Sequence, residues 1–157
     1  MSKKPTPIVG KNIDTFLSGI KDSNQFNLQQ AKLIPFYKPG DEMALTSIFL
    51  SGLRLIKEFR KGVFKTISLK DSGKIHFFSE VEFTLFNKRV DGLILIERGK
   101  KIVDGLIIEV KNKNNELDPV QISNYIEIAK AYKIPKILTI SNQFVNFPTQ
   151  SPINVKT

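Results

Sequence analysis

Two apolar runs at residues 90–96 and 102–110 constrain the fold of this chain most strongly. Each run has the length of a β-strand, and a short basic turn at 98–101 joins them, so together they predict a β-hairpin. Strands that are apolar along almost their whole length are buried on both faces, as in a sheet that helices cover. The hairpin therefore predicts the centre of an α/β fold.

Charged residues interrupt the apolar strands of this hairpin. Asp91 lies on the first strand, and Glu109 and Lys111 lie at the end of the second. With the turn centred on Lys100, Asp91 lies directly opposite Glu109, and opposed residues share a face at about 5 Å. The alternation of side chains along a strand places Lys111 on that face too. Two carboxylates and a lysine are thus expected to converge, provided that the register is not shifted by one residue.

Two carboxylates in apolar strands are costly to bury unless a cation compensates them. A divalent ion would do so, and it would also polarise a phosphodiester and activate a bound water. Lys111 would then stabilise negative charge in the transition state or help to position the attacking water. The alternative is a buried ion pair between Lys111 and one of the acids at the end of the strand.

Other acids lie on or near the same strands. Asp104 precedes Glu109 by five residues, so it points to the opposite face, and we expect it near the turn, exposed or bonded to a loop. Glu80 and Glu82 share a face of an earlier strand. Such alternating acids are typical of a solvated face, although one of them could add to the acidic site.

Residues on two predicted helices extend the candidate site. Glu42 lies on the apolar face of its helix, either as a residue that interacts with the helix N-terminus or as a third acid that reaches the metal. Gln121 and Tyr125 share a face of the helix that follows Lys111. Gln121 could bond the lysine or a phosphate, and Tyr125 could contact the substrate backbone. Alternatively, Tyr125 belongs to the core and Gln121 to the surface.

The rest of the pattern predicts helices and strands around the hairpin. Asp41 suits the N-cap of the clearest helix, and Gly62 suits its end. Asp118 and Pro119 suit the start of a later helix. The order of elements predicts an α/β sandwich with a central mixed sheet of four to five strands flanked by helices. In chain order we expect a flexible arm at 1–12, helices at 13–34 and 41–62, strands at 63–69, 75–86, 90–96 and 102–110, a helix at 119–132, a strand at 136–140 and an unpatterned tail from 142.

Composition narrows the possible chemistry. The chain has no cysteine and one histidine, His76, which excludes disulfides, a thiol nucleophile and a multi-histidine metal site within one chain. A metal would be held by oxygen ligands, which favours magnesium or manganese. The net charge of +9 suits a polyanionic partner such as nucleic acid, although a lysine-rich solvated surface explains it equally well. No apolar run reaches the ~20 residues of a membrane span, and we expect a cytoplasmic location.

With these residues in view, the chain resembles the PD-(D/E)xK nuclease superfamily, which has a restriction-endonuclease-like core. The resemblance rests on the motifs at 89–92, 109–111 and 121–125, and the Gln-x-x-x-Tyr spacing of the last is similar to that of RecB-like nucleases and type I restriction subunits. The leading proline of the superfamily is replaced by Val90. The resemblance spans residues 41–141, with an N-terminal arm and helix at 1–40 and a C-terminal tail at 142–157.

The resemblance implies Mg²⁺-dependent (or Mn²⁺-dependent) cleavage of DNA phosphodiester bonds by an endonuclease of the restriction or repair type. The alternatives are a nucleic-acid-binding module that keeps the fold without cutting, and an unrelated small interaction domain. Whether the chain acts as a homodimer or as part of a longer protein stays open. The implied roles are metal binding by Asp91, Glu109, the Val110 carbonyl and Glu42, catalysis by Asp91, Glu109, Lys111 and Gln121, and DNA contact by Tyr125, Arg89 and Lys113.

Overall fold

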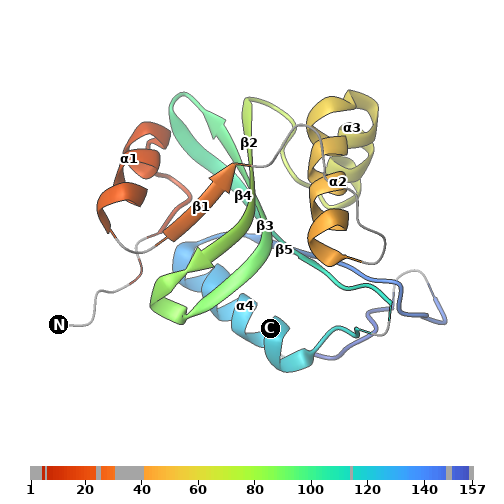
Figure 1. The fold of residues 1–157 in the computed structure, drawn as a ribbon. Coiled ribbons are helices and arrows are strands. Elements are labelled where there is room, and N and C mark those ends of the chain that lie inside the picture. The colour runs from red at the N-terminus through yellow and green to blue at the C-terminus, as the bar shows by residue number, and fades with distance from the viewer. Residues whose placement is uncertain are drawn as a thin grey trace.

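The structure is a computed structural model, and its centre is one mixed sheet of five strands with helices on both faces (Figure 1). The strands follow one another across the sheet in the order of the sequence. The α/β class and the mixed, helix-flanked sheet that the sequence predicted are therefore confirmed. The structure describes residues 5, 7–23, 26–30, 41–113, 115–147 and 150–155.

Neighbouring strands of the sheet are antiparallel except for the last, which runs parallel to the fourth. The parallel pair is possible because a helix crosses over between these two strands. None of the described helices is long and apolar enough to cross a membrane. The elements are α1 (Ile13–Ser23), β1 (Phe26–Gln30), α2 (Glu42–Leu55), α3 (Lys57–Thr66), β2 (Lys74–Phe83), the 3₁₀ turn η1 (Thr84–Phe86), β3 (Lys88–Arg98), β4 (Lys101–Val110), α4 (Pro119–Tyr132) and β5 (Lys136–Ile140).

The central hairpin of β3 and β4 has the register that the sequence predicted at the end where the acids lie. Gly92 pairs with Ile108, so the adjacent Asp91 and Glu109 are opposed. At the other end the turn consists of two residues, Gly99 and Lys100, which both have positive φ. This turn alone would shift the register by one residue. A bulge between Ile96 and Glu97 restores the register along the rest of the hairpin.

The two faces of the hairpin belong to two separate hydrophobic cores. Leu93 and Ile107 face α4 and α1, whereas Ile94 and Ile108 face α2 and α3, and all four are fully buried. Burial of one such side chain contributes roughly 1.5–3 kcal/mol. A slip by one residue would exchange the two faces, so the packing of both cores fixes the register that brings the acids together.

Two helices begin near the acidic end of the hairpin, and each has the cap that the sequence predicted. The Asp41 carboxylate accepts a hydrogen bond from Met43 N at 2.9 Å, and the Asp118 carboxylate accepts one from Val120 N at 2.9 Å. These caps satisfy amide groups that the first turn of a helix leaves unpaired. The caps thereby fix where α2 and α4 start relative to the ends of the strands.

The region after α2 differs from the prediction. The single helix expected at 41–62 is two helices, because the chain leaves the helical conformation at Ile56. The strand expected at 63–69 is wrong, since α3 continues to Thr66. Phe64 is 1% exposed and anchors α3 on the sheet. The β-branched residues there favour a strand by propensity, and burial of one helix face overrides this weak preference.

The N-terminal region also differs from the prediction. The helix expected at 13–34 ends at Ser23, and β1 follows it as an edge strand of the sheet, while 31–34 lies outside the described residues. Ile8, expected in a flexible arm, is fully buried, and its amide donates to Tyr132 O at 2.7 Å. The described part of the first 30 residues therefore belongs to the same fold as the hairpin.

Candidate functional site

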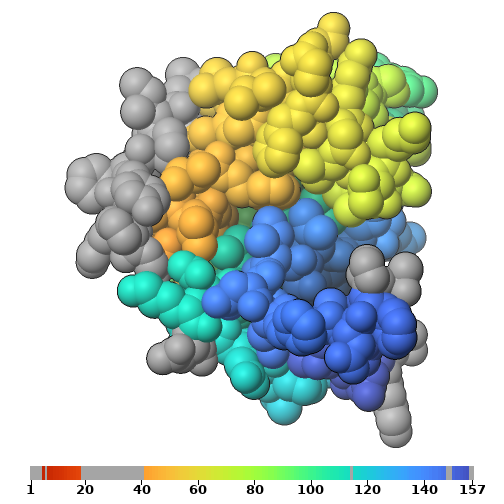
Figure 2. All heavy atoms as spheres, turned by 90° about the vertical axis from the view of Figure 1, so that its right-hand side faces the viewer, coloured from red at the N-terminus to blue at the C-terminus, as the bar shows by residue number. Residues whose placement is uncertain are grey.

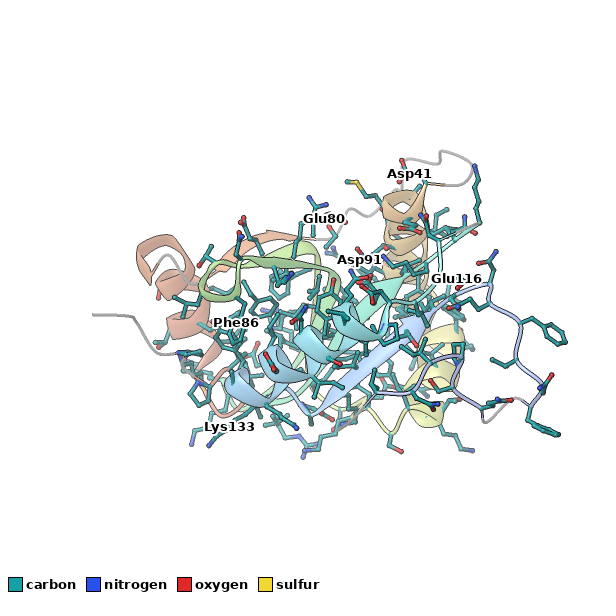
Figure 3. All side chains as sticks on the ribbon, turned by 90° about the horizontal axis from the view of Figure 1, so that it is seen from below. Asp41, Glu80, Phe86, Asp91, Glu116 and Lys133 are labelled. Atoms are coloured by element: carbon teal, nitrogen blue, oxygen red, sulfur yellow. The ribbon has the colours of Figure 1, made fainter. Side chains whose placement is uncertain are left out.

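The acidic residues gather at the end of the sheet near the start of α2. Figure 3 shows Asp91 close to Glu80, with Asp41 above them at the first turn of the helix. Strands β2, β3 and β4 each contribute one carboxylate, from Glu80, Asp91 and Glu109. These carboxylates lie close enough for their charges to interact. We call these three carboxylates the acidic site.

Asp91 is held across the hairpin and is difficult to ionise. Its Oδ2 accepts a hydrogen bond from Val110 N at 2.7 Å, which fixes the carboxylate beside Glu109. Burial and the charge of Glu109 raise the pKa of Asp91 to about 7, although the bond from Val110 lowers it. Near neutral pH, Asp91 is therefore only partly ionised, and a nearby cation would favour its charged form.

Lys111 compensates one of the two carboxylates. Its Nζ lies 2.9 Å from Glu109 Oε1, in a pair whose side chains are 17% and 1% exposed. Burial lowers the pKa of Lys111, but the bond to Glu109 and its charge outweigh this and raise it above its usual value, so the lysine stays charged. Glu109 Oε2 is buried and has no hydrogen-bond partner among the described residues. One lysine thus faces two acids, and part of their charge stays uncompensated.

Glu42 holds the loop that follows β4. Its Oε1 accepts hydrogen bonds from Asn112 N and Asn115 Nδ2, both at 2.9 Å. The N-terminus of its own helix is capped by Asp41 instead. The charge of Glu42 still acts on Lys111, whose pKa it helps to raise. In this structure Glu42 positions the segment that carries Lys111, and one of its oxygens is already occupied.

Gln121 and Tyr125 form a hydrogen-bonded chain that ends on β3. Gln121 Nε2 donates to Tyr125 Oη at 2.8 Å, and the hydroxyl of Tyr125 donates to Arg89 O at 2.9 Å. Tyr125 is 2% exposed and lies in the core, where its hydroxyl is already hydrogen-bonded, so its contact with DNA stays a prediction. Burial and the charge of Glu109 raise its pKa. These two hydrogen bonds fix the backbone of β3 at Arg89, two residues before Asp91.

The two basic residues expected to contact DNA are exposed. The Arg89 side chain is 63% exposed, and its Nε lies 3.1 Å from Glu80 Oε2. Lys113 is exposed on the loop after β4, where its carbonyl accepts a hydrogen bond from Asn142 Nδ2 at 3.2 Å. Both cations are accessible from solvent, whereas Glu80 and Asp91 are only partly exposed and Glu109 is buried.

Glu80 belongs to the acidic site, although the sequence pattern placed this residue on a solvated face. Its side chain is 14% exposed, and its backbone has a φ of 53° inside β2, which redirects the side chain. Burial raises the pKa of Glu80, Arg89 lowers it, and the charges of Glu109 and Asp41 raise it further. The pairing of Ser79 with Gly92 places Glu80 next to Asp91. The register between β2 and β3 would have been the signal that identifies Glu80 as a residue of the site.

Asp104 lies on the opposite face from Glu109, as the sequence predicted, but it is not exposed. It is 3% exposed and binds Lys136 Nζ at 2.8 Å and 3.1 Å. It also accepts a hydrogen bond at 3.2 Å from Lys70 N, in the loop before β2. Lys136 of β5 compensates the charge of Asp104 and so offsets the cost of burying it. Asp104 therefore has a structural role.

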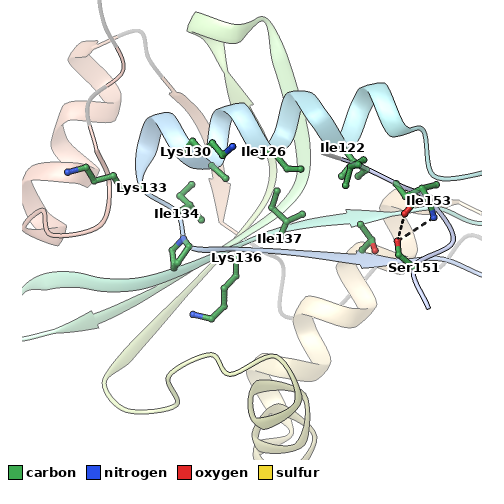
Figure 4. Close-up of a pocket in the computed structure, with 13 residues that line it drawn as sticks. Ile122, Ile126, Lys130, Lys133, Ile134, Lys136, Ile137, Ser151 and Ile153 are labelled. Carbon is green, nitrogen blue, oxygen red and sulfur yellow. Dashed lines mark hydrogen bonds between the residues drawn. The ribbon is translucent and has the colours of Figure 1, made fainter. Parts of the chain in front are cut away.

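Among the apolar hollows that border β5 are two that no residue of the acidic site lines. One, of about 580 Å³, lies between α4 and β5 and is lined by Ile122, Ile126 and Ile137 (Figure 4). The other, of about 550 Å³, is lined by residues of α2 and by Ile140, with Lys111 among its lining residues. Figure 2 shows the face on which α2 and α3, in orange and yellow, meet the blue segment around β5.

The donor set of the acidic site fits a hard divalent cation. No group of three or more His, Cys, Asp or Glu side chains arranged to hold a metal occurs among the described residues. Mg²⁺ does not need such a group, because it often takes one or two carboxylates and keeps several waters. The unpartnered oxygen of Glu109 and the raised pKa of Asp91 are both features that a bound cation would relieve.

Comparisons with known proteins add no further constraint. No family model, no curated protein and no solved structure matches this chain. The functional argument therefore rests on the residues of the acidic site and on their geometry.

Proposed function

We propose that this chain is a Mg²⁺- or Mn²⁺-dependent nuclease that hydrolyses phosphodiester bonds of DNA, with a restriction-endonuclease-like core. One observation carries the proposal: Asp91 and Glu109 are opposed at one end of a hairpin, and Lys111 is the one cation among the described residues that compensates them. A fold gains no stability from two adjacent buried acids with one cation. A site that binds a divalent cation and a phosphate explains why the chain would keep them.

Asp91, Glu109 and the Val110 carbonyl would hold the cation, which when bound supplies Lewis acidity and lowers the pKa of a bound water. Lys111 keeps its charge beside Glu109, where it can stabilise the negative charge that develops on the phosphate. Gln121 acts as a positioning residue, because its hydrogen bond orients the hydroxyl of Tyr125 that holds the backbone of β3.

Cleavage of linear and plasmid DNA tests this proposal directly. With Mg²⁺ or Mn²⁺ the wild-type chain should cut and EDTA should stop it, while Asp91→Asn and Lys111→Met should each lower the rate by about 100-fold or more. Both variants should still bind DNA. Glu58→Gln removes the charge of an exposed carboxylate on α3 and serves as the matched control. Cutting at the wild-type rate by Glu109→Gln would show that the metal site is elsewhere.

A nucleic-acid-binding module that does not cut is the second candidate, and one observation favours it. Lys111 neutralises Glu109, and a proton on Asp91 could neutralise the other acid near pH 7 without any metal. Such a module would bind DNA with a steep dependence on salt and would be unaffected by EDTA. The same DNA substrates therefore separate the two candidates.

A further inference from the structure

Arg89 makes its ion pair with an unexpected partner. In the ladder between β2 and β3, the residue directly opposite Arg89 is Glu82. Opposed charges in a regular pair of strands interact with each other. Instead, Arg89 Nε lies 3.1 Å from Glu80 Oε2, two residues away along β2. The positive φ of Glu80 interrupts the regular alternation and turns its carboxylate toward this position.

Glu80 shares the electrostatic environment of the acidic site. Its side chain is 14% exposed, and the charged groups that act on it include Asp91 and Arg89 from β3, Glu109 from β4 and Asp41 from the start of α2. Only Arg89 among these favours the ionised carboxylate. The pair is asymmetric, because the Arg89 side chain is 63% exposed. The cation that compensates Glu80 is thus the member of the pair that solvent and ligands can reach.

The acidic site also shows an independent sign that it takes a cation. The Glu109 side chain is 1% exposed, and both of its oxygens, like Glu80 Oε2, are buried without a hydrogen-bond partner among the described residues. Glu80 acts on this same carboxylate electrostatically, since the charge of Glu109 raises the pKa of Glu80. A divalent ion near Glu109 would therefore also attract Glu80, if Arg89 did not already compensate it.

We propose that Arg89 is a removable cover of Glu80: a backbone phosphate binds the exposed guanidinium, draws it away, and so frees the Glu80 carboxylate as a third acidic group for the divalent cation. Arginine suits this exchange because its planar group binds phosphate through two hydrogen bonds. The inference rests on the proposed nuclease function and adds to it a coupling between substrate and metal. Bound phosphate and bound cation strengthen each other through the same ion pair.

Calorimetric titration of Mn²⁺ into the full chain without nucleic acid tests, apart from cleavage, whether Arg89 keeps Glu80 from the cation. Arg89→Ala should bind Mn²⁺ about tenfold more tightly than the wild-type chain, because it exposes Glu80 to the cation. Glu80→Gln should lower the affinity of Arg89→Ala about tenfold and that of the wild-type chain by less than twofold, which is the signature of a coupled pair. Lys101→Ala removes an exposed charge beside the far turn and controls for net charge.

The outcomes separate this inference from the proposed function. If the wild-type chain neither binds Mn²⁺ nor cuts DNA, the proposed function fails. If it binds and cuts while Arg89→Ala leaves the Mn²⁺ affinity unchanged, only the cover is refuted. A loss of Mn²⁺ affinity in Glu80→Gln as large as that in Glu109→Gln also overturns the cover, because Glu80 would then bind the cation permanently. Circular dichroism shows whether each variant folds, and Arg89→Gln replaces Arg89→Ala if it does not.

Discussion

At the scale of single residues, the ionised form of Asp91 beside Glu109 lowers the stability of the fold that holds both residues. Burial and the charge of Glu109 raise the pKa of Asp91 to about 7 from a usual value of 3.8. The folded chain therefore binds this proton more tightly than the unfolded chain does. The stability that the protonated form contributes is full below about pH 4 and is lost as the pH rises through about 7.

Asp91→Asn should consequently stabilise the metal-free chain at high pH. At pH 8 we expect a gain in the free energy of unfolding on the order of 2 kcal/mol, since solvent screening reduces the full effect of the shift, and at pH 4 we expect almost none. Urea denaturation in EDTA at both pH values measures this difference, with Glu58→Gln as control. Saturating Mg²⁺ at pH 8 should stabilise the wild-type chain and not the variant. An equal effect of Asp91→Asn at both pH values would contradict the raised pKa.

The elements that the sequence predicted correctly are those whose pattern follows from burial. The two apolar strands of the central hairpin were predictable from their length and composition. The register at their acidic end was also predicted correctly, although it depends on a bulge that the sequence did not reveal, because the two-residue turn alone would shift it. The α3 helix was not, since Val63 and its neighbours favour a strand locally. Nor was the position of Glu80, because a left-handed residue inside a strand leaves no trace in the alternation. Packing and backbone conformation decided both cases.

Two glycines, one in the loop before β2 and one in the β3–β4 turn, differ in how strongly their positions require glycine. Gly73 has a φ of 120°, and an added Cβ would clash with Glu97 O, whereas Gly99 has a φ of 56° and open space around it. Gly73→Ala should cost about 3 kcal/mol or more through the clash, and Gly99→Ala about 1 kcal/mol through backbone strain alone. Urea denaturation of the two variants compares these costs. Equal costs would show that the loop before β2 adjusts easily around Gly73 and that the contact with Glu97 does not hold it in place.

Charge is distributed unevenly over the whole molecule. The chain has a formal net charge of +9, yet one end of its sheet brings together Asp41, Glu42, Glu80, Asp91 and Glu109. A basic surface attracts a polyanion over long distances, and a local group of acids repels it unless a cation intervenes. Under the proposed function, the exposed basic residues beside the acids, such as Arg89 and Lys113, would form a basic rim that binds DNA, and the acids would accept a phosphate only together with a metal ion.

The rim can be located by the salt dependence of DNA binding. Each phosphate that a lysine or arginine neutralises contributes about 0.9 to the slope of log K against log salt concentration. Arg89→Ala and Lys113→Ala, at the exposed edge of the acidic site, should each reduce the magnitude of this slope by about 1. Lys101→Ala removes the same charge beside the turn at the far end of the hairpin and should leave the slope unchanged. Fluorescence anisotropy of a labelled duplex in EDTA, titrated at several salt concentrations, measures all of these slopes without cleavage. A loss with Lys101→Ala that equals the other two would mean that the polyanion binds over the whole basic surface rather than beside the acids.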